Sequence, residues 1–88
     1  MECTYKQQLG FRVRTIAKQS LLFGGSSKAY QLNDTGLFIW NELESEKRIE
    51  EITDSLAQLY ERSQSLNDDV HDFIHFLLSI NAIKETKG

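Results

Sequence analysis

The sequence predicts an α+β fold in which a three-stranded antiparallel sheet is followed by three helices. Polar and apolar residues alternate with the period of strands between residues 11 and 32, and apolar residues recur at helical spacing between residues 35 and 80. Strands that come first and helices that follow are typical of a segregated α+β domain. The chain has 88 residues, 40% of them hydrophobic, and no proline. We therefore expect a single domain over residues 1–88 with a small core.

Strand-like alternation fills the first part of the chain. The first expected strand has one apolar face and one mostly basic face, with Phe11, Val13, Thr15 and Ala17 alternating with Arg12, Arg14, Ile16 and Lys18. Residues 20–23 form a second short strand, and residues 24–27 form a glycine-containing turn. Residues 28–32 are the third strand. A meander of three strands leaves at least one edge unpaired.

Residues 28–40 contain the third strand, a polar joint and the start of the first helix, and the rest of the chain is organised around them. Asn33, Asp34 and Thr35 are short polar residues that cap a helix start. We expect Gly36 to mark a place where the first helical turn approaches neighbouring backbone. The apolar block at residues 37–40, with Leu43 one turn later, predicts a buried helix over about residues 35–43.

Two further helices complete the prediction. The second covers about residues 48–62, with an apolar stripe of Ile49, Ile52, Leu56, Leu59 and Tyr60. After a loop at residues 63–66, Asn67, Asp68 and Asp69 cap a third helix that ends near residue 80, before Asn81. Its apolar side comprises Val70, Phe73, Ile74, Leu77 and Leu78, widened by Phe76 and Ile80. Either a small core uses this whole width, or part of the face lines a groove. Residues 82–84 add a short tail strand.

The charge distribution is uneven along the chain. Residues 1–32 have a net charge of +4 and residues 33–88 a net charge of −7. An acidic helical half disfavours nucleic acid, because neutralisation of phosphates supplies most of that affinity. The basic strands could attract an acidic peptide or simply form a solvated surface. No apolar run is long enough for a membrane span and the N-terminus has no signal region, so we expect no membrane contact and a cytoplasmic location.

Motifs for catalysis or metal binding are weak, so we expect no catalytic residues, no metal and no cofactor. His71 and His75 lie one helical turn apart, but a catalytic zinc needs a third protein ligand and the chain has no other histidine. The Asp34-Thr35-Gly36 triplet matches that of aspartic proteases, yet here it opens a helix. Cys3 is the only cysteine, in an N-terminus expected to be mobile, so no internal disulfide can form.

Residues 11–83 resemble the PqqD-like proteins, which recognise leader peptides in pathways to ribosomally made natural products. The resemblance rests on the run from Tyr30 to Gly36 that leads into Ile39 and Trp40, together with Ser20-Leu21-Leu22, Ile49-Glu50-Glu51-Ile52 and the spacing of Val70, Phe73 and Leu77 before Ala82-Ile83. It implies a winged-helix-like fold of three strands and three helices. It also implies a non-catalytic peptide chaperone that delivers a precursor to a radical S-adenosylmethionine maturase or a lasso leader peptidase.

By the same resemblance, the leader peptide adds as a strand in a groove between the third strand and the third helix. The residues expected to form this groove are Lys28, Ala29, Tyr30, Gln31, Leu32, Val70, Phe73, Ile74 and Leu77. Two other functions stay open on the residues alone. One is a winged-helix DNA-binding module, which the acidic helices disfavour, and the other is a small scaffold subunit that binds a protein surface.

Overall fold

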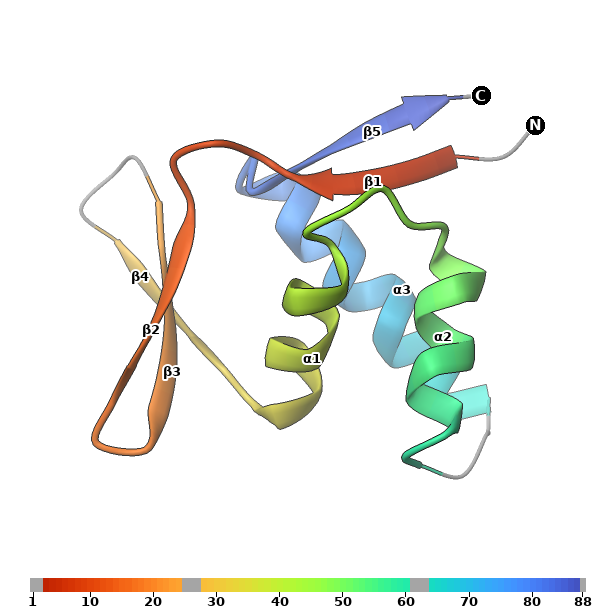
Figure 1. The fold of residues 1–88 in the computed structure, drawn as a ribbon, viewed down its shortest axis with the longest axis horizontal. Coiled ribbons are helices and arrows are strands. Elements are labelled where there is room, and N and C mark those ends of the chain that lie inside the picture. Colours follow the sequence, from red (N-terminus) through yellow and green to blue (C-terminus); the bar gives the residue numbers. More distant parts are fainter. Residues whose placement is uncertain (1–2, 25–27, 61–63, 88) are drawn as a thin grey trace.

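The polypeptide forms two antiparallel sheets and three helices (Figure 1). We analysed a computed structural model, which describes residues 3–24, 28–60 and 64–87. The elements follow the order β1 (Cys3–Gln7), β2 (Arg12–Ile16), β3 (Gln19–Phe23), β4 (Ala29–Leu32), α1 (Asp34–Glu42), α2 (Ile49–Ala57), α3 (Gln64–Ser79) and β5 (Ile83–Lys87). The predicted α+β architecture, with a three-stranded sheet before three helices, is confirmed.

The three-stranded sheet has the order β2-β3-β4. Its register aligns Val13 with Leu22 and Leu22 with Tyr30, so these three side chains share the face that packs on the core. The helices lie on this side of the sheet (Figure 1). The first predicted strand ends earlier than expected because Ala17 and Lys18 turn the chain with positive φ angles of 53° and 66°. Two central residues with positive φ are typical of the tight hairpin turn that suits twisted strands.

Helix α1 begins where the polar joint predicts. Asn33 is its N-cap, and the Asn33 side-chain oxygen accepts a 2.7 Å hydrogen bond from the backbone N–H of Gly36. Asp34 and Thr35, which were also predicted as caps, are instead the first residues inside the helix. Asp34 still places a negative charge in the first turn, where it complements the helix dipole.

The boundaries of α2 and α3 differ from the prediction. Helix α2 ends at Ala57, and its expected last residue, Arg62, lies outside the described residues. Helix α3 already begins at Gln64, so the predicted loop is helical over residues 64–66, and Asn67, Asp68 and Asp69 lie inside the helix rather than capping it. The earlier start brings Leu66 into the core as a buried residue. The predicted end is confirmed, since Asn81 adopts a φ of 60° and the next N–H, of Ala82, bonds to the Leu77 carbonyl at 2.9 Å.

Strands β1 and β5 form a second sheet that the sequence did not predict. The expectation of a mobile N-terminus was wrong, because Cys3 pairs with Lys87 and Tyr5 is buried in the core. Tyr5 also exchanges two backbone hydrogen bonds with Lys47 in the segment between α1 and α2, at 2.8 and 3.0 Å. The strands are mostly polar, so they carry little local signal. The tail strand is longer than the predicted residues 82–84.

The core lies between the three-stranded sheet and the helices, and it is closed at one end by β1 and β5. Its fully buried large side chains are Leu22, Ile39, Leu43, Ile52, Leu56, Val70, Ile74 and Leu77. Over residues 3–24, 28–60 and 64–87, no helix combines the length and apolar character needed to cross a membrane.

Candidate functional site

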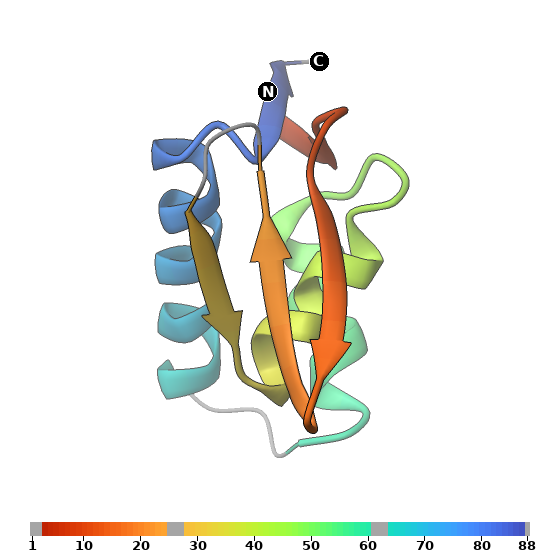
Figure 2. The same ribbon diagram turned by 90° about the vertical axis from the view of Figure 1, so that its left-hand side faces the viewer.

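Strand β4 has a free edge beside helix α3. It pairs with β3 on one side, and no described strand pairs with its other side, because β5 joins β1 in the separate sheet. Figure 2 shows α3 running along the same side of the sheet as β4. A strand edge of this kind presents backbone N–H and C=O groups that an extended chain can pair with.

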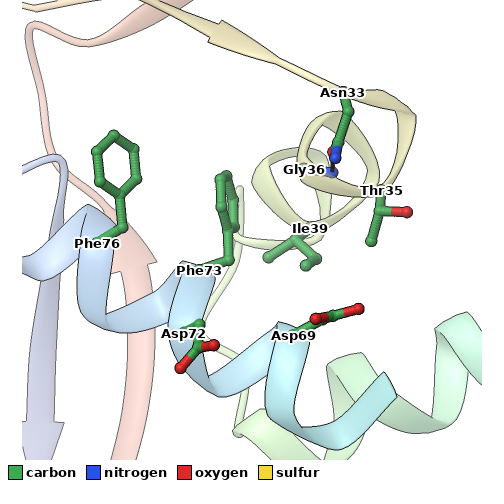
Figure 3. A pocket seen from close by; sticks show the side chains of 8 residues that line it. All are labelled: Asn33, Thr35, Gly36, Ile39, Asp69, Asp72, Phe73 and Phe76. Atoms are coloured by element: carbon green, nitrogen blue, oxygen red, sulfur yellow. Dashed lines mark hydrogen bonds between the residues drawn. The ribbon is translucent and has the colours of Figure 1, made fainter. Parts of the chain in front are cut away.

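A hollow of about 390 Å³ lies where β4 leads into α1, facing α3 (Figure 3). Its α1 side is formed by the first turn of that helix, and its other side by one face of α3. The residues that line it are Asn33, Thr35, Gly36, Ile39, Asp69, Asp72, Phe73 and Phe76. We call the hollow and the adjoining β4 edge the β4–α3 groove.

Three aromatic rings in a row link the strand to the helix. The ring centroids of Tyr30 on β4 and Phe76 on α3 are 5.4 Å apart in an edge-to-face arrangement, and those of Phe76 and Phe73 are 6.1 Å apart. All three side chains are only partly buried. Such rings offer large apolar area and defined contact geometry to a ligand. The groove therefore carries aromatic surface from β4 to α3, beside polar residues such as Asn33 and Asp72.

Gly36 lets the ring of Phe73 lie close against α1. A Cβ atom at position 36 would be 3.3 Å from two ring carbons of Phe73 and 3.2 Å from the side-chain oxygen of Asn33. The nearest atoms at Gly36 thus belong to an aromatic side chain and the helix cap, and not to neighbouring backbone as predicted. The glycine keeps open the space between the first turn of α1 and the ring.

The structure separates the predicted α3 residues into two groups. Phe73 lines the groove, whereas Val70, Ile74 and Leu77 have no accessible surface and belong to the core. Side chains without accessible surface cannot touch a ligand that approaches from solvent, so the placement of these three in the groove wall needs correction.

Sequence reasoning missed Phe76, Asp69 and Asp72 as groove residues. With Phe73 these positions form a stripe at helical spacing, immediately beside the core stripe that contains Val70 and Leu77. The sequence did contain one indication of these groove residues, because Phe76 makes the apolar face of the helix wider than core packing alone requires.

The predicted β4 residues also take different places. Leu32 is buried in the core, and Tyr30 belongs to the aromatic row. Ala29 and Gln31 are exposed and point to the opposite face of the sheet, as strand alternation requires. Lys28 is exposed and precedes the strand. The backbone of the whole strand, however, borders the groove, so side-chain direction does not remove these residues from the edge.

Residues considered for catalysis lie on the surface or at a helix start. His71 and His75 are exposed on α3, and the described residues include no group of three or more histidine, cysteine or acidic side chains that could hold a metal ion. Asp34 is exposed in the first turn of α1. At Cys3, a hydrogen bond with Glu85 raises the thiol pKa, but this pair lies on the β1–β5 sheet, away from the groove.

Comparisons with known proteins identify a family and similar folds. A family model described as coenzyme PQQ synthesis protein D (PqqD) matches residues 19–83. A search of curated proteins finds no match. Among solved structures, TbiB1 in complex with the TbiA(beta) leader peptide is similar, with a TM-score of 0.76, 25% identity and coverage of 90% of this chain and 94% of that one.

Two more solved structures share the fold. The solution NMR structure of the PqqD truncation of Methylobacterium extorquens PqqCD, described as a stand-alone RiPP recognition element, gives a TM-score of 0.75 at 14% identity and covers 92% of this chain and 88% of that one. The structure of lasso peptide synthetase B1 complexed with the leader peptide gives a TM-score of 0.69 at 20% identity and covers 94% of this chain and 98% of that one.

Proposed function

This chain belongs to the PqqD family, and from that premise we propose that it binds the leader segment of a ribosomally made precursor peptide and presents the precursor to a modifying enzyme. We propose that it does so without catalysis of its own, in the cytoplasm, where such precursors are made. The observation that carries the proposal is the free β4 edge beside a row of partly buried aromatic rings. The similarity to TbiB1, whose structure contains a leader peptide, supports it.

The energetics of strand addition explain why both the edge and the rings are needed. Each backbone hydrogen bond in a ladder contributes only about 0.5–1.5 kcal/mol net. Ordering a flexible peptide costs about 2–5 kcal/mol or more. A few ladder bonds therefore only offset the ordering cost. Apolar anchors that contribute about 1.5–3 kcal/mol each when buried must supply the affinity.

The groove assigns these two tasks to different elements. Pairing with β4 sets the direction and register of the leader but reads no sequence. Phe73, Phe76 and Tyr30 receive the apolar side chains of the leader and so select its sequence. The enzyme that receives the precursor is a radical S-adenosylmethionine maturase or a leader peptidase, the two kinds of partner that the family resemblance implies.

The first test is the affinity for the precursor peptide encoded beside this protein's gene, measured by isothermal titration calorimetry. We expect Phe76→Ser to weaken binding at least about tenfold, because an apolar anchor of the groove is lost. The matched control is Leu59→Ser, since Leu59 is 64% exposed and does not line the groove. If folded Phe76→Ser protein binds the precursor as tightly as the control, the groove is not the binding site.

The second test separates strand addition from side-chain docking. Single N-methyl groups are placed at successive residues of the leader, which removes one backbone donor at a time without changing the protein. Because alternate residues of a strand direct their N–H groups to the same side, we expect the affinity loss to recur at every second position. A flat profile along the peptide would argue against pairing with β4.

A further inference from the structure

The face of the three-stranded sheet that points away from the core is covered by no described element. Figure 2 looks onto this face, and the helices lie behind it. The register places Arg12, Phe23 and Ala29 in one row across the sheet, and Arg14, Leu21 and Gln31 in the next. Ile16 stands at the hairpin end and is 52% exposed. Antiparallel sheets with one solvated face normally carry polar residues there, so Leu21, Phe23 and Ile16 are unusual.

The face is also hollowed, and all of its charged side chains are basic. A hollow of about 520 Å³ is lined by Gly10, Phe11, Arg12, Arg14, Phe23 and Gly24. Residues 11–32 contain no aspartate or glutamate. Neither Arg12 nor Arg14 has an ion-pair partner within the part of the chain that the structure describes. Arg12 and Arg14 thus line the same hollow as Phe11 and Phe23, and among the described residues no carboxylate pairs with either arginine.

We propose that this outer sheet face docks the modifying enzyme through a surface that carries carboxylates beside apolar side chains. Guanidinium groups pair with carboxylates in a planar, two-bond geometry, and Leu21, Phe23 and Ile16 supply the apolar part of the contact. The inference rests on the proposed function for the identity of the partner. It concerns a different side of the molecule from the leader groove, so one protein can hold both at once.

The charge and extent of the face favour this partner over others. A nucleic acid would meet two arginines here but also a helical half with a net charge of −7, and its affinity depends on neutralising many phosphates. Three strands of four or five residues cover roughly 15 Å by 10 Å, well below the ~800 Å² a side of a stable interface. The contact should therefore be transient and salt-sensitive, as suits a protein that delivers its cargo and leaves.

The test uses the full-length protein and the modifying enzyme encoded beside its gene. We expect Arg12→Gln/Arg14→Gln to weaken enzyme binding about tenfold or more at low salt, and Arg12→Glu/Arg14→Glu to weaken it further, because charge reversal adds repulsion. The matched control is Lys6→Gln/Lys84→Gln, which removes two cross-strand basic residues from the β1–β5 sheet. Circular dichroism checks that each variant folds. We expect all of them to fold, because the substituted side chains are exposed.

Other outcomes would overturn the inference. If the folded arginine variants bind the enzyme within about twofold of wild type, the face is not part of the interface. If wild-type protein retards duplex DNA in a gel and the arginine variants do not, the face binds nucleic acid. If wild-type protein is a dimer in sedimentation velocity and the arginine variants are monomers, the face binds a second copy of the chain. Leader affinity is measured on the same samples. If the leader fails to bind wild type while the enzyme still requires the arginines, the proposed function fails and the docking face stands.

Discussion

Gly36 leaves space in the β4–α3 groove beside the first turn of α1. The residue follows a helix cap and its backbone N–H is held by Asn33, so its position is determined by the start of α1. Phe73, which lies more than thirty residues later in the chain, approaches it from α3. The glycine therefore serves a tertiary contact, since a Cβ atom would crowd the ring of Phe73 and its own backbone does not adopt a positive φ.

We expect Gly36→Ala to lower the free energy of unfolding by about 1 kcal/mol, because crowding of about 1–3 kcal/mol exceeds the gain of about 1 kcal/mol in helix propensity. The loss should become smaller in a Phe73→Leu background, where the smaller side chain leaves space and only the contact with the Asn33 oxygen remains. Urea denaturation of the two single variants and the double variant measures this coupling. Additive effects in that cycle would show that the glycine and the ring do not constrain each other.

The carboxylate of Glu51 makes the stability at the start of α2 depend on pH. Its carboxylate accepts a 3.0 Å hydrogen bond from the backbone N–H of Arg48 and lies 3.3 Å from the Arg48 Nε. The backbone hydrogen bond, followed by the side-chain one, lowers the pKa of Glu51 below its ordinary value of 4.5. A lowered pKa in the folded state means that the carboxylate stabilises the fold above pH 4.5, and that this contribution is lost as the pH falls below that value.

We expect Glu51→Gln to reduce the Tm slightly at pH 7 and to reduce the difference in Tm between pH 7 and pH 3.5, because glutamine caps Arg48 without titrating. Thermal denaturation at the two pH values measures both effects. Glu50→Gln is the control, since Glu50 is exposed in the same turn. An equal change in both variants would place the pH dependence elsewhere.

At the scale of the element, α3 has two apolar stripes with different tasks. One stripe, which includes Val70, Ile74 and Leu77, is fully buried in the core. The neighbouring stripe, which includes Phe73 and Phe76, borders the groove. This division explains the excess width seen in the sequence: the helix both closes the core and forms one wall of the groove.

The two stripes should respond oppositely to truncation. Leu77→Ala should lower the free energy of unfolding by about 2–5 kcal/mol, because it leaves a cavity in the core, while the folded protein binds the leader within about twofold of wild type. His75→Ala, an exposed change on the same helix, is the control and should alter neither quantity. A large loss of leader affinity in folded Leu77→Ala protein would return Leu77 to the binding surface.

At the scale of the whole molecule, β1 and β5 join the two ends of the chain and close one end of the core. Tyr5 inserts into the core, and burial raises the pKa of its hydroxyl. The same strand binds the segment between α1 and α2 through the hydrogen bonds of Tyr5 and Gln7 with Lys47 and Leu43. The small sheet thus stabilises the helices on which the groove depends, although it lies outside the groove itself.

We expect Tyr5→Ala to lower the free energy of unfolding by about 3 kcal/mol, since a large buried ring is lost. Lys6→Ala on the same strand removes an exposed side chain and should have little effect. Chemical denaturation of both variants tests the difference. Equal stabilities would mean that the buried ring of Tyr5 contributes nothing to the folded state.

Much of the fold could be predicted because its elements have strong local patterns. The alternation around Leu22 and Tyr30 predicts the central strands, and the polar joint before Gly36 predicts the start of α1 within one residue. The start of α3 was misplaced because asparagine and aspartate at residues 67–69 are typical caps, yet the burial of Leu66 favours an earlier start. The β1–β5 pairing was missed because polar strands from the two ends of the chain carry no shared local signal.

The sequence by itself determined which segments are strands or helices, their order, and that the strand before Asn33 leads directly into a helix, because these follow from side-chain periodicity and capping chemistry within a few residues. Only the tertiary structure decided which stripe of α3 faces the groove and which is buried. Periodicity shows that a helix face is apolar but does not show what covers it, and the answer depends on contacts between residues such as Tyr30 and Phe76 that lie far apart in the chain.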